Sequence, residues 1–159
     1  MTGGGSSIPE VQRLLAVLAA GKRCAEVGTA FGEGAVAIAS TAESLVTVEQ
    51  DPERAAIAAG RLAGLANVEL LVGDWRGELP QRAPFELLFF DGGRFEEAAD
   101  SIELLEPGGF LVKDDLTPGW NEPDPVRGLL FSHPELVAVE LLTTPATAAV
   151  VATRVVRDA

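Results

Sequence analysis

Short apolar runs that alternate with segments of helical periodicity constrain this fold more than any other feature of the sequence. The expected strands are residues 23–27, 45–49, 68–72, 86–90 and 110–113. The expected helices are residues 9–20, 34–40, 52–62, 75–79 and 95–105, with 75–79 the weakest. Asp51 and Pro52 mark the clearest helix start, because they supply an N-cap and a first-turn proline. Strands that alternate with helices predict a parallel sheet covered on both faces.

The pattern changes near the C-terminus. A loop rich in Pro and Gly over residues 117–125 leads to a short expected helix at 126–131 and to two β-rich runs at 136–142 and 146–156. Because a parallel return needs a connection of about a dozen residues or more, these two runs can pair only antiparallel. The sequence therefore predicts a Rossmann-like α/β fold: a doubly wound, mostly parallel sheet of seven strands with a C-terminal antiparallel hairpin.

Length and composition suit one domain. The 159 residues are 47% apolar, which is enough for one buried core and too little for two full domains. Residues 1–7 are rich in Gly and Ser and are expected to form a disordered leader, with residues 8–159 as the folded domain. The apolar stretches are shorter than the roughly 20 residues that span a bilayer, so no membrane span is expected. Cys24 is the single cysteine, which fits a reducing, cytoplasmic location.

The net charge is strongly negative. The chain carries 24 acidic and 12 basic residues, which gives a formal net charge of -12. A field of this sign repels polyanions at long range. Nucleic acid is therefore a disfavoured partner.

A glycine-rich turn follows the first expected strand. Residues 26–34 read Glu-Val-Gly-Thr-Ala-Phe-Gly-Glu-Gly and lead into a helix. In open parallel sheets, ligands bind at the carboxyl ends of the strands, and glycines without a Cβ let the backbone come close to them. The predicted ligand contacts of this turn are Glu26, Gly28, Thr29, Gly32 and Gly34. The alternative is a turn that only packs a strand on a helix.

Acidic residues also follow the next three strands. Glu49 ends the second strand, about twenty residues beyond the glycines, where a carboxylate can accept both hydroxyls of a ribose. Gly73, Asp74 and Trp75 follow the third strand. Asp74 is placed to accept from an adenine amino group, and Trp75 either stacks on the ligand or caps the core. Asp91 follows the fourth strand.

These strand ends together resemble the class I S-adenosylmethionine-dependent methyltransferases, over residues 23–156. The resemblance implies S-adenosylmethionine as cofactor, with Glu26 facing its amino group or sulfonium. NAD-binding Rossmann domains differ, because their glycines usually read GxGxxG and their last strand is normally parallel. The implied cofactor-binding residues are Glu26, Gly28, Thr29, Gly32, Gly34, Glu49, Gly73, Asp74, Trp75 and Asp91.

Within that class the sequence is most similar to the metal-dependent catechol and caffeoyl-CoA type O-methyltransferases. Asp91 with Arg94 is similar to the Asp-x-x-Lys of these enzymes, and residues 113–115, Lys-Asp-Asp, are similar to their Ala-Asp-Asn. The loop that shapes their acceptor pocket is similar to residues 118–119, Pro-Gly, and to residues 123–128, which include Asp124, Val126 and Arg127. The resemblance implies a magnesium ion held by Asp91, Asp114 and Asp115. Three hard oxygen ligands suit magnesium or calcium and do not suit a soft metal.

The resemblance names Asp91 and Arg94 as the catalytic residues. A bound metal would lower the pKa of an acceptor hydroxyl and hold it in line with the sulfonium methyl. Arg94 stands where the family has a lysine base, and a guanidinium can clamp an anion but cannot accept a proton. Asp115 replaces an asparagine. Residues 91–96 also resemble a broader group of methyltransferases that have Asp-Gly-x-His-x-Tyr at this strand end, with His at the position of Arg94 and Tyr near Glu96.

The leading functional hypothesis is O-methylation of a small or medium acceptor by S-adenosylmethionine, with or without the help of a divalent metal. The alternatives are a cofactor-binding module without catalysis and, with least support, an NAD-dependent oxidoreductase. The expected partner is a small-molecule acceptor. A homodimer is an open alternative, because a second subunit could complete the acceptor pocket.

Overall fold

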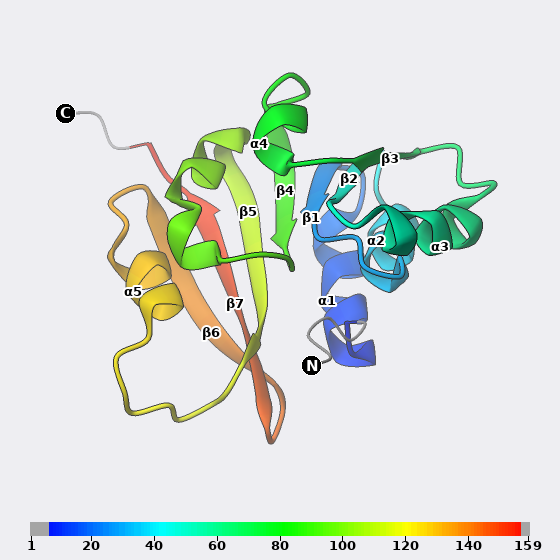
Figure 1. The fold of residues 1–159 in the computed structure, drawn as a ribbon. Helices are drawn as coiled ribbons and strands as arrows, with labels where there is room; N and C mark the ends of the chain where they lie inside the picture. The colour runs from blue at the N-terminus through cyan, green and yellow to red at the C-terminus, as the bar shows by residue number, and fades with distance from the viewer. Residues whose placement is uncertain (1–6, 157–159) are drawn as a thin grey trace.

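A twisted seven-stranded sheet forms the centre of the computed structural model, which describes residues 7–156 (Figure 1). The strands are β1 (Arg23–Val27), β2 (Ser44–Glu49), β3 (Val68–Val72), β4 (Phe85–Phe90), β5 (Leu105–Leu116), β6 (Leu136–Thr144) and β7 (Thr147–Arg154). The α-helices are α1 (Pro9–Ala19), α2 (Glu33–Ala39), α3 (Pro52–Leu62), α4 (Trp75–Glu78) and α5 (Pro125–Ser132). Two 3-10 helices, η1 (Phe95–Glu97) and η2 (Ala99–Leu104), lie between β4 and β5.

The strand order is β3-β2-β1-β4-β5-β7-β6. Strands β1 to β5 pair in parallel, and β7 pairs antiparallel with both β5 and β6. The predicted fold class, including the C-terminal hairpin, is therefore confirmed. The order of the strands reverses between β1 and β4, and this is the point where such sheets bind ligands.

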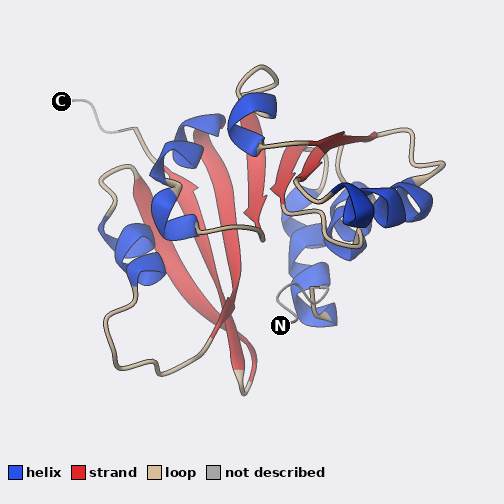
Figure 2. Cartoon of the chain, viewed as in Figure 1, coloured by secondary structure: helices blue, strands red, loops and turns tan. Residues whose placement is uncertain are grey.

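Helices cover both faces of the sheet (Figure 2). Helices α1, α2 and α3 bury Leu15, Ile38 and Ala58 in one apolar cluster. On the other face, α4, the 3-10 helices and α5 contribute to a second cluster, which includes Trp75 and Leu130. None of the helices in residues 7–156 is both long enough and apolar enough to cross a membrane.

The segment over residues 95–105 differs from the predicted single helix. The structure has two short 3-10 helices there, η1 and η2, which bury Phe95, Ser101, Ile102 and Leu104. Strand β5 also begins at Leu105, five residues earlier than the predicted start at 110. The Pro and Gly residues that suggest a turn there lie within the strand, where its register with β4 shifts at a bulge.

The predicted leader is only partly described. Residues 1–6 of it lie outside the described residues. Ser7 is described and is 7% exposed, and its backbone carbonyl accepts a hydrogen bond from the Gln12 side chain. Ser7 is therefore packed against the start of α1.

Candidate functional site

A cleft of about 560 Å³ opens at the carboxyl ends of the strands, where β1 and β4 meet. Its size falls in the range of about 300–1,000 Å³ that is usual for ligand sites. Six of the residues predicted for a site line it: Gly28, Glu49, Gly73, Trp75, Asp91 and Arg94. The chain therefore brings the ends of four strands to one concave surface, as the sequence predicts.

Glu49 holds the glycine turn in place at the end of β2. Its Oε2 accepts a hydrogen bond from the backbone N–H of Ala30 at 2.8 Å, and its Oε1 accepts from that of Asp51 at 3.0 Å. Each carboxylate oxygen has a second lone pair, so Glu49 can still accept hydrogen bonds from a ligand in the cleft. This geometry suits the predicted contact with a ribose.

The two loops after β1 and β4 touch through their glycines. A Cβ on Gly28 would lie 2.6 Å from the backbone nitrogen of Gly92, and one on Gly92 would lie 2.9 Å from the Cα of Gly28. The sequence suggests that Gly28 is needed for close approach to a ligand. The structure adds a second reason, which is that the neighbouring backbone leaves no room for a side chain.

Three of the predicted cofactor-binding residues lie behind the cleft. Glu26 is 1% exposed, and its carboxylate accepts a hydrogen bond from the Thr47 hydroxyl at 2.6 Å. The Thr47 hydroxyl in turn lies 2.6 Å from that of Thr29. A Cβ on Gly34 would overlap the Glu26 carboxylate. Burial raises the pKa of Glu26 well above its usual value, and the hydrogen bond from Thr47 opposes that rise only in part. Glu26, Thr29 and Gly34 therefore support the wall of the cleft and do not line it.

The indole at the start of α4 forms part of the cleft wall. Trp75 is 7% exposed and packs edge-on against Phe90, with ring centroids 5.7 Å apart. The guanidinium of Arg76 lies 4.4 Å from the centre of the indole. Asp74 is the N-cap of α4, where its Oδ1 accepts from the backbone N–H of Arg76 at 3.0 Å, and it is not among the residues that line the cleft. Gly32, the N-cap of α2, is also outside the lining.

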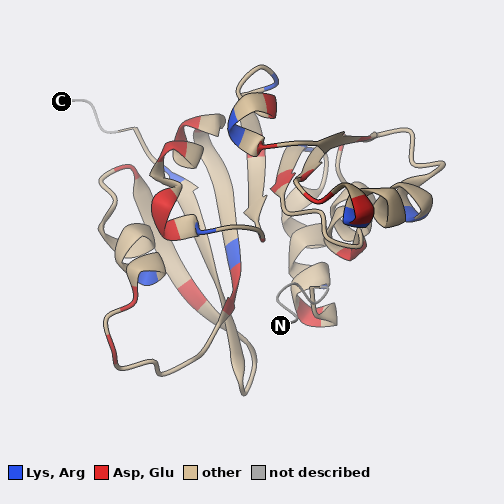
Figure 3. Ribbon diagram, viewed as in Figure 1, with Lys and Arg blue, Asp and Glu red and all other residues tan. Residues whose placement is uncertain are grey.

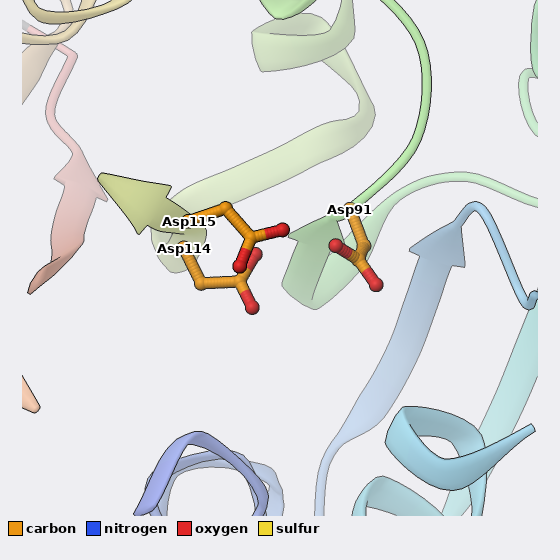
Figure 4. Close-up of side chains that lie close together, drawn as sticks. All are labelled: Asp91, Asp114 and Asp115. Atoms are coloured by element: carbon orange, nitrogen blue, oxygen red, sulfur yellow. The ribbon is translucent and has the colours of Figure 1, made fainter. Parts of the chain in front are cut away.

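Asp91, Asp114 and Asp115 form an acid cluster at the ends of β4 and β5 (Figure 4). One oxygen from each carboxylate lies within 4.8 Å of the others. Burial and then the charges of Asp114 and Asp115 raise the pKa of Asp91 to about 8. Burial and then the charge of Asp115 raise the pKa of Asp114 to about 6. The three carboxyl groups therefore repel one another when ionised, and the chain compensates this charge poorly.

The donor set of the acid cluster fits a hard divalent cation. Asp114 is 2% exposed, and its Oδ1 is buried without a hydrogen-bond partner in the described chain. Buried carboxylate oxygens are normally satisfied, and magnesium prefers this kind of ligand. Asp115 has a left-handed backbone with φ of 60°, a conformation that asparagine adopts more easily than most residues. This accounts physically for an asparagine at the matched position of the similar enzymes.

Two basic residues lie near the acid cluster, and they differ in placement. The Arg94 side chain is 71% exposed, and it forms ion pairs with Glu96 and Glu97 on the rim of the cleft. The Lys113 side chain is 13% exposed, and its Nζ lies 3.9 Å from Oδ1 of Asp114. Sequence reasoning gave Lys113 no role of its own. Its position next to Asp114 in the chain was the available signal.

Arg127 anchors the loop between β5 and α5, which Figure 2 shows outside the sheet. Its guanidinium binds the carboxylates of Asp124 and Glu140, and Nη2 donates to the backbone carbonyl of Thr117 at 2.7 Å. Arg127 thereby holds both ends of the loop, through Thr117 and Asp124, and joins them to β6 through Glu140. It is the loop predicted from the sequence to shape an acceptor pocket.

Curated proteins that are similar in sequence match about three fifths of this chain. No family model matches the chain. A protein-L-isoaspartate O-methyltransferase from Pyrococcus horikoshii is 33% identical over 101 residues, which are 62% of this chain and 46% of that protein. One from Brucella anthropi is 33% identical over 97 residues, 60% of this chain and 45% of that protein. The chain thus spans about half the length of the curated relatives it matches.

Solved structures match over nearly the whole chain. An S-adenosylmethionine-dependent O-methyltransferase from Thermotoga maritima has a TM-score of 0.79 at 19% identity, and the match covers 98% of this chain and 69% of that one. The O-methyltransferase TomG from Streptomyces achromogenes, solved in complex with S-adenosylmethionine, has a TM-score of 0.71 at 24% identity, covering 95% and 82%. The chain therefore has the fold of the class I S-adenosylmethionine-dependent methyltransferases.

Proposed function

We propose that this protein transfers a methyl group from S-adenosylmethionine to an oxygen atom of a small or medium acceptor. The observation that carries the proposal is the meeting of Glu49 with the glycine turn and Asp91 in one cleft, at the reversal of strand order. The methyltransferase fold and the sequence relatives support it. We assign the activity to a single domain over residues 8–159 and expect it to act in the cytoplasm.

The proposed cofactor contacts follow from the cleft. Glu49 accepts from the ribose hydroxyls, and Trp75 provides an apolar surface for the adenine. Gly28 and Gly73 let the backbone come close to the ligand. Asp74 lies between the lining residues Gly73 and Trp75, and its Oδ2, which takes no part in the capping bond, would accept from the adenine amino group. Glu26, Thr29, Gly32 and Gly34 shape the turn that contacts the methionine part.

Methyl transfer is a direct displacement. The acceptor oxygen forms a bond to the methyl carbon, the bond from that carbon to sulfur breaks, and S-adenosylhomocysteine leaves with the bonding pair. The acceptor must lose its hydroxyl proton. Asp91, with a pKa of about 8 when no metal is bound, is suited to exchange a proton near neutral pH. Arg94 on the rim is placed to steer or clamp an anionic part of the acceptor.

A divalent cation is the proposed helper of this step. Asp91, Asp114 and Asp115 would hold it, and magnesium would act there as a Lewis acid that lowers the pKa of the acceptor hydroxyl. The buried Oδ1 of Asp114 supports this assignment. Asp91 belongs both to the acid cluster and to the lining of the cleft. The cluster would therefore hold the metal next to the bound cofactor.

A peptide isoaspartyl carboxylate is the second candidate acceptor, because the sequence relatives are protein-L-isoaspartate O-methyltransferases. The charges of this chain oppose it. An acceptor carboxylate would approach three clustered acids in a chain whose net charge is -12, as the many acidic residues in Figure 3 illustrate. A neutral hydroxyl avoids this repulsion. We therefore favour the hydroxyl acceptor.

Calorimetry with S-adenosylmethionine, S-adenosylhomocysteine and NAD tests the cofactor. We expect binding of the first two and none of NAD, and at least tenfold weaker S-adenosylhomocysteine binding after Glu49→Gln. Glu122→Gln, an exposed change in the β5–α5 loop, is the matched control. Binding of NAD, with no binding of S-adenosylmethionine or S-adenosylhomocysteine, would instead support an oxidoreductase.

Turnover assays then test the reaction. Catechols, caffeoyl thioesters and an isoaspartyl peptide are incubated with labelled S-adenosylmethionine, with and without magnesium. We expect methylation of a hydroxyl acceptor. Transfer to the peptide alone would favour the second candidate, and cofactor binding without transfer to any acceptor would favour a module without catalysis.

A further inference from the structure

Lys113 is a mostly buried cation beside the acid cluster. It lies on β5 directly before Asp114, and its side chain is 13% exposed. Its Nζ lies 3.9 Å from Oδ1 of Asp114 and donates to the backbone carbonyl of the same residue at 3.0 Å. The ammonium thus lies directly beside Asp114, at the edge of the acid cluster.

The placement of Lys113 contrasts with that of the other basic groups. Arg94 lines the same cleft, but its charge is largely taken up by Glu96 and Glu97, and its side chain is 71% exposed. Lys22 is the chain's only other lysine. It precedes β1, at the end of the sheet opposite the cleft, where its Nζ lies 5.9 Å from the ring centre of Phe110. Lys22 is therefore a natural control for Lys113.

We propose that Lys113 is the resident counter-cation of the acid cluster and sets how tightly a divalent metal binds there. This inference rests on the proposed function only in treating the acid cluster as a cation site. The ammonium neutralises part of the charge that would attract a metal, and it repels a second cation in the same partly buried space. The cluster is therefore a weak divalent site, from which metal exchanges readily.

The size of the effect follows from electrostatics. Removing one unit charge from beside a divalent ion changes its binding by at least about tenfold even where water screens strongly, and by more in a partly buried site. The charge of Lys22, at the far end of the sheet, lies beyond about one Debye length in physiological salt and should have little effect. The two lysines therefore predict clearly different outcomes.

Binding of Mn²⁺ to the full chain tests the proposal, followed by electron paramagnetic resonance. Lys113→Met is expected to tighten Mn²⁺ binding by at least about tenfold, whereas Lys113→Arg, which keeps the charge, and Lys22→Met should change it by less than about threefold. Unchanged or weaker binding by Lys113→Met would overturn the proposal. So would an absence of Mn²⁺ binding by both the wild type and Lys113→Met.

A measurement on the wild type covers the case that Lys113→Met fails to fold. Reductive methylation with ¹³C-formaldehyde labels both lysines and leaves them positively charged. Substoichiometric Mn²⁺ should broaden the NMR signal of Lys113 well before that of Lys22, and equal broadening would overturn the proposal. Binding of S-adenosylhomocysteine to the same samples keeps the two questions apart. Its loss would count against the proposed function, while the Mn²⁺ series still decides the role of Lys113.

Discussion

Replacing Asp91 by asparagine should stabilise the metal-free protein at alkaline pH. Burial and the neighbouring acids raise the pKa of Asp91 from 3.8 to about 8 in the folded chain. The folded chain therefore keeps a proton that the unfolded chain releases as the pH rises between these two values. Folding stability falls across this window, and the loss is complete once the folded carboxylate ionises above about pH 8.

The structure sets the magnitude of this effect. One pKa unit corresponds to about 1.4 kcal/mol, so the whole shift would amount to more than about 5 kcal/mol. Solvent reaches part of the Asp91 side chain and screens its charge, which reduces the expected gain in the free energy of unfolding to about 2 kcal/mol. An asparagine amide can also donate a hydrogen bond toward the unpartnered Oδ1 of Asp114.

Urea unfolding followed by tryptophan fluorescence, in the presence of EDTA, measures the difference. We expect the free energy of unfolding of Asp91→Asn to exceed that of the wild type by about 2 kcal/mol at about pH 8.5 and by almost nothing at about pH 4. The exposed Glu122→Gln should show no such pH dependence. Magnesium should narrow the gap, because it stabilises the wild type. A gap that is the same at both pH values, or a variant less stable at pH 8.5, would refute the account of the acid cluster.

Four further substitutions test other contacts. Gly92→Ala should lower the free energy of unfolding by about 2 kcal/mol, because its Cβ would press on the Cα of Gly28. Gly60→Ala is the matched control. It lies within α3 with open space around it, and because alanine favours a helix it should raise the free energy of unfolding by up to about 1 kcal/mol. Thermal denaturation compares the two. Arg127→Met should lower the free energy of unfolding by about 2 kcal/mol, because Asp124 and Glu140 lose their ion-pair partner. Limited proteolysis should then cut the β5–α5 loop faster than in the wild type. Asp115→Asn should preserve or slightly raise stability, since asparagine tolerates the left-handed backbone there, and a loss above about 1 kcal/mol would contradict this.

Local signals account for the parts of the fold that sequence analysis predicted best. Strands β1 and β3 and helix α3 have the predicted bounds. Each is bounded by residues that act locally, such as Asp51 and Pro52 before α3 and Gly73 after β3. The start of β5 was missed, because a bulge within a strand and a turn before it have the same composition of Pro and Gly. Pairing with β4, which is not local, decides between them.

The candidate site was predictable where topology alone gathers residues. Parallel strands end on one side of a sheet, so Glu49 and Asp91 had to lie near the same cleft once the strand order was known. The direction of single side chains was not predictable. Glu26 points into the interior beneath α2, and the flexible side chain of Lys113 bends towards its neighbour's carboxylate, although adjacent residues on a strand face opposite sides of the sheet.

Proton, ammonium and metal compete for the same negative charges in the acid cluster. Asp91 holds a proton near neutral pH and Lys113 sits beside Asp114, so a divalent cation that binds there must displace one of these positive charges. Lys113 is covalently tethered, which leaves the proton as the charge that departs. Binding of Mn²⁺ at about pH 7 should therefore release about one proton. Calorimetry in buffers of different ionisation enthalpy measures this release, and Asp91→Asn should abolish it while weakening the binding. Proton release that persists in Asp91→Asn would mean that another group carries the proton, and the raised pKa of Asp91 could not then be the link between pH and metal.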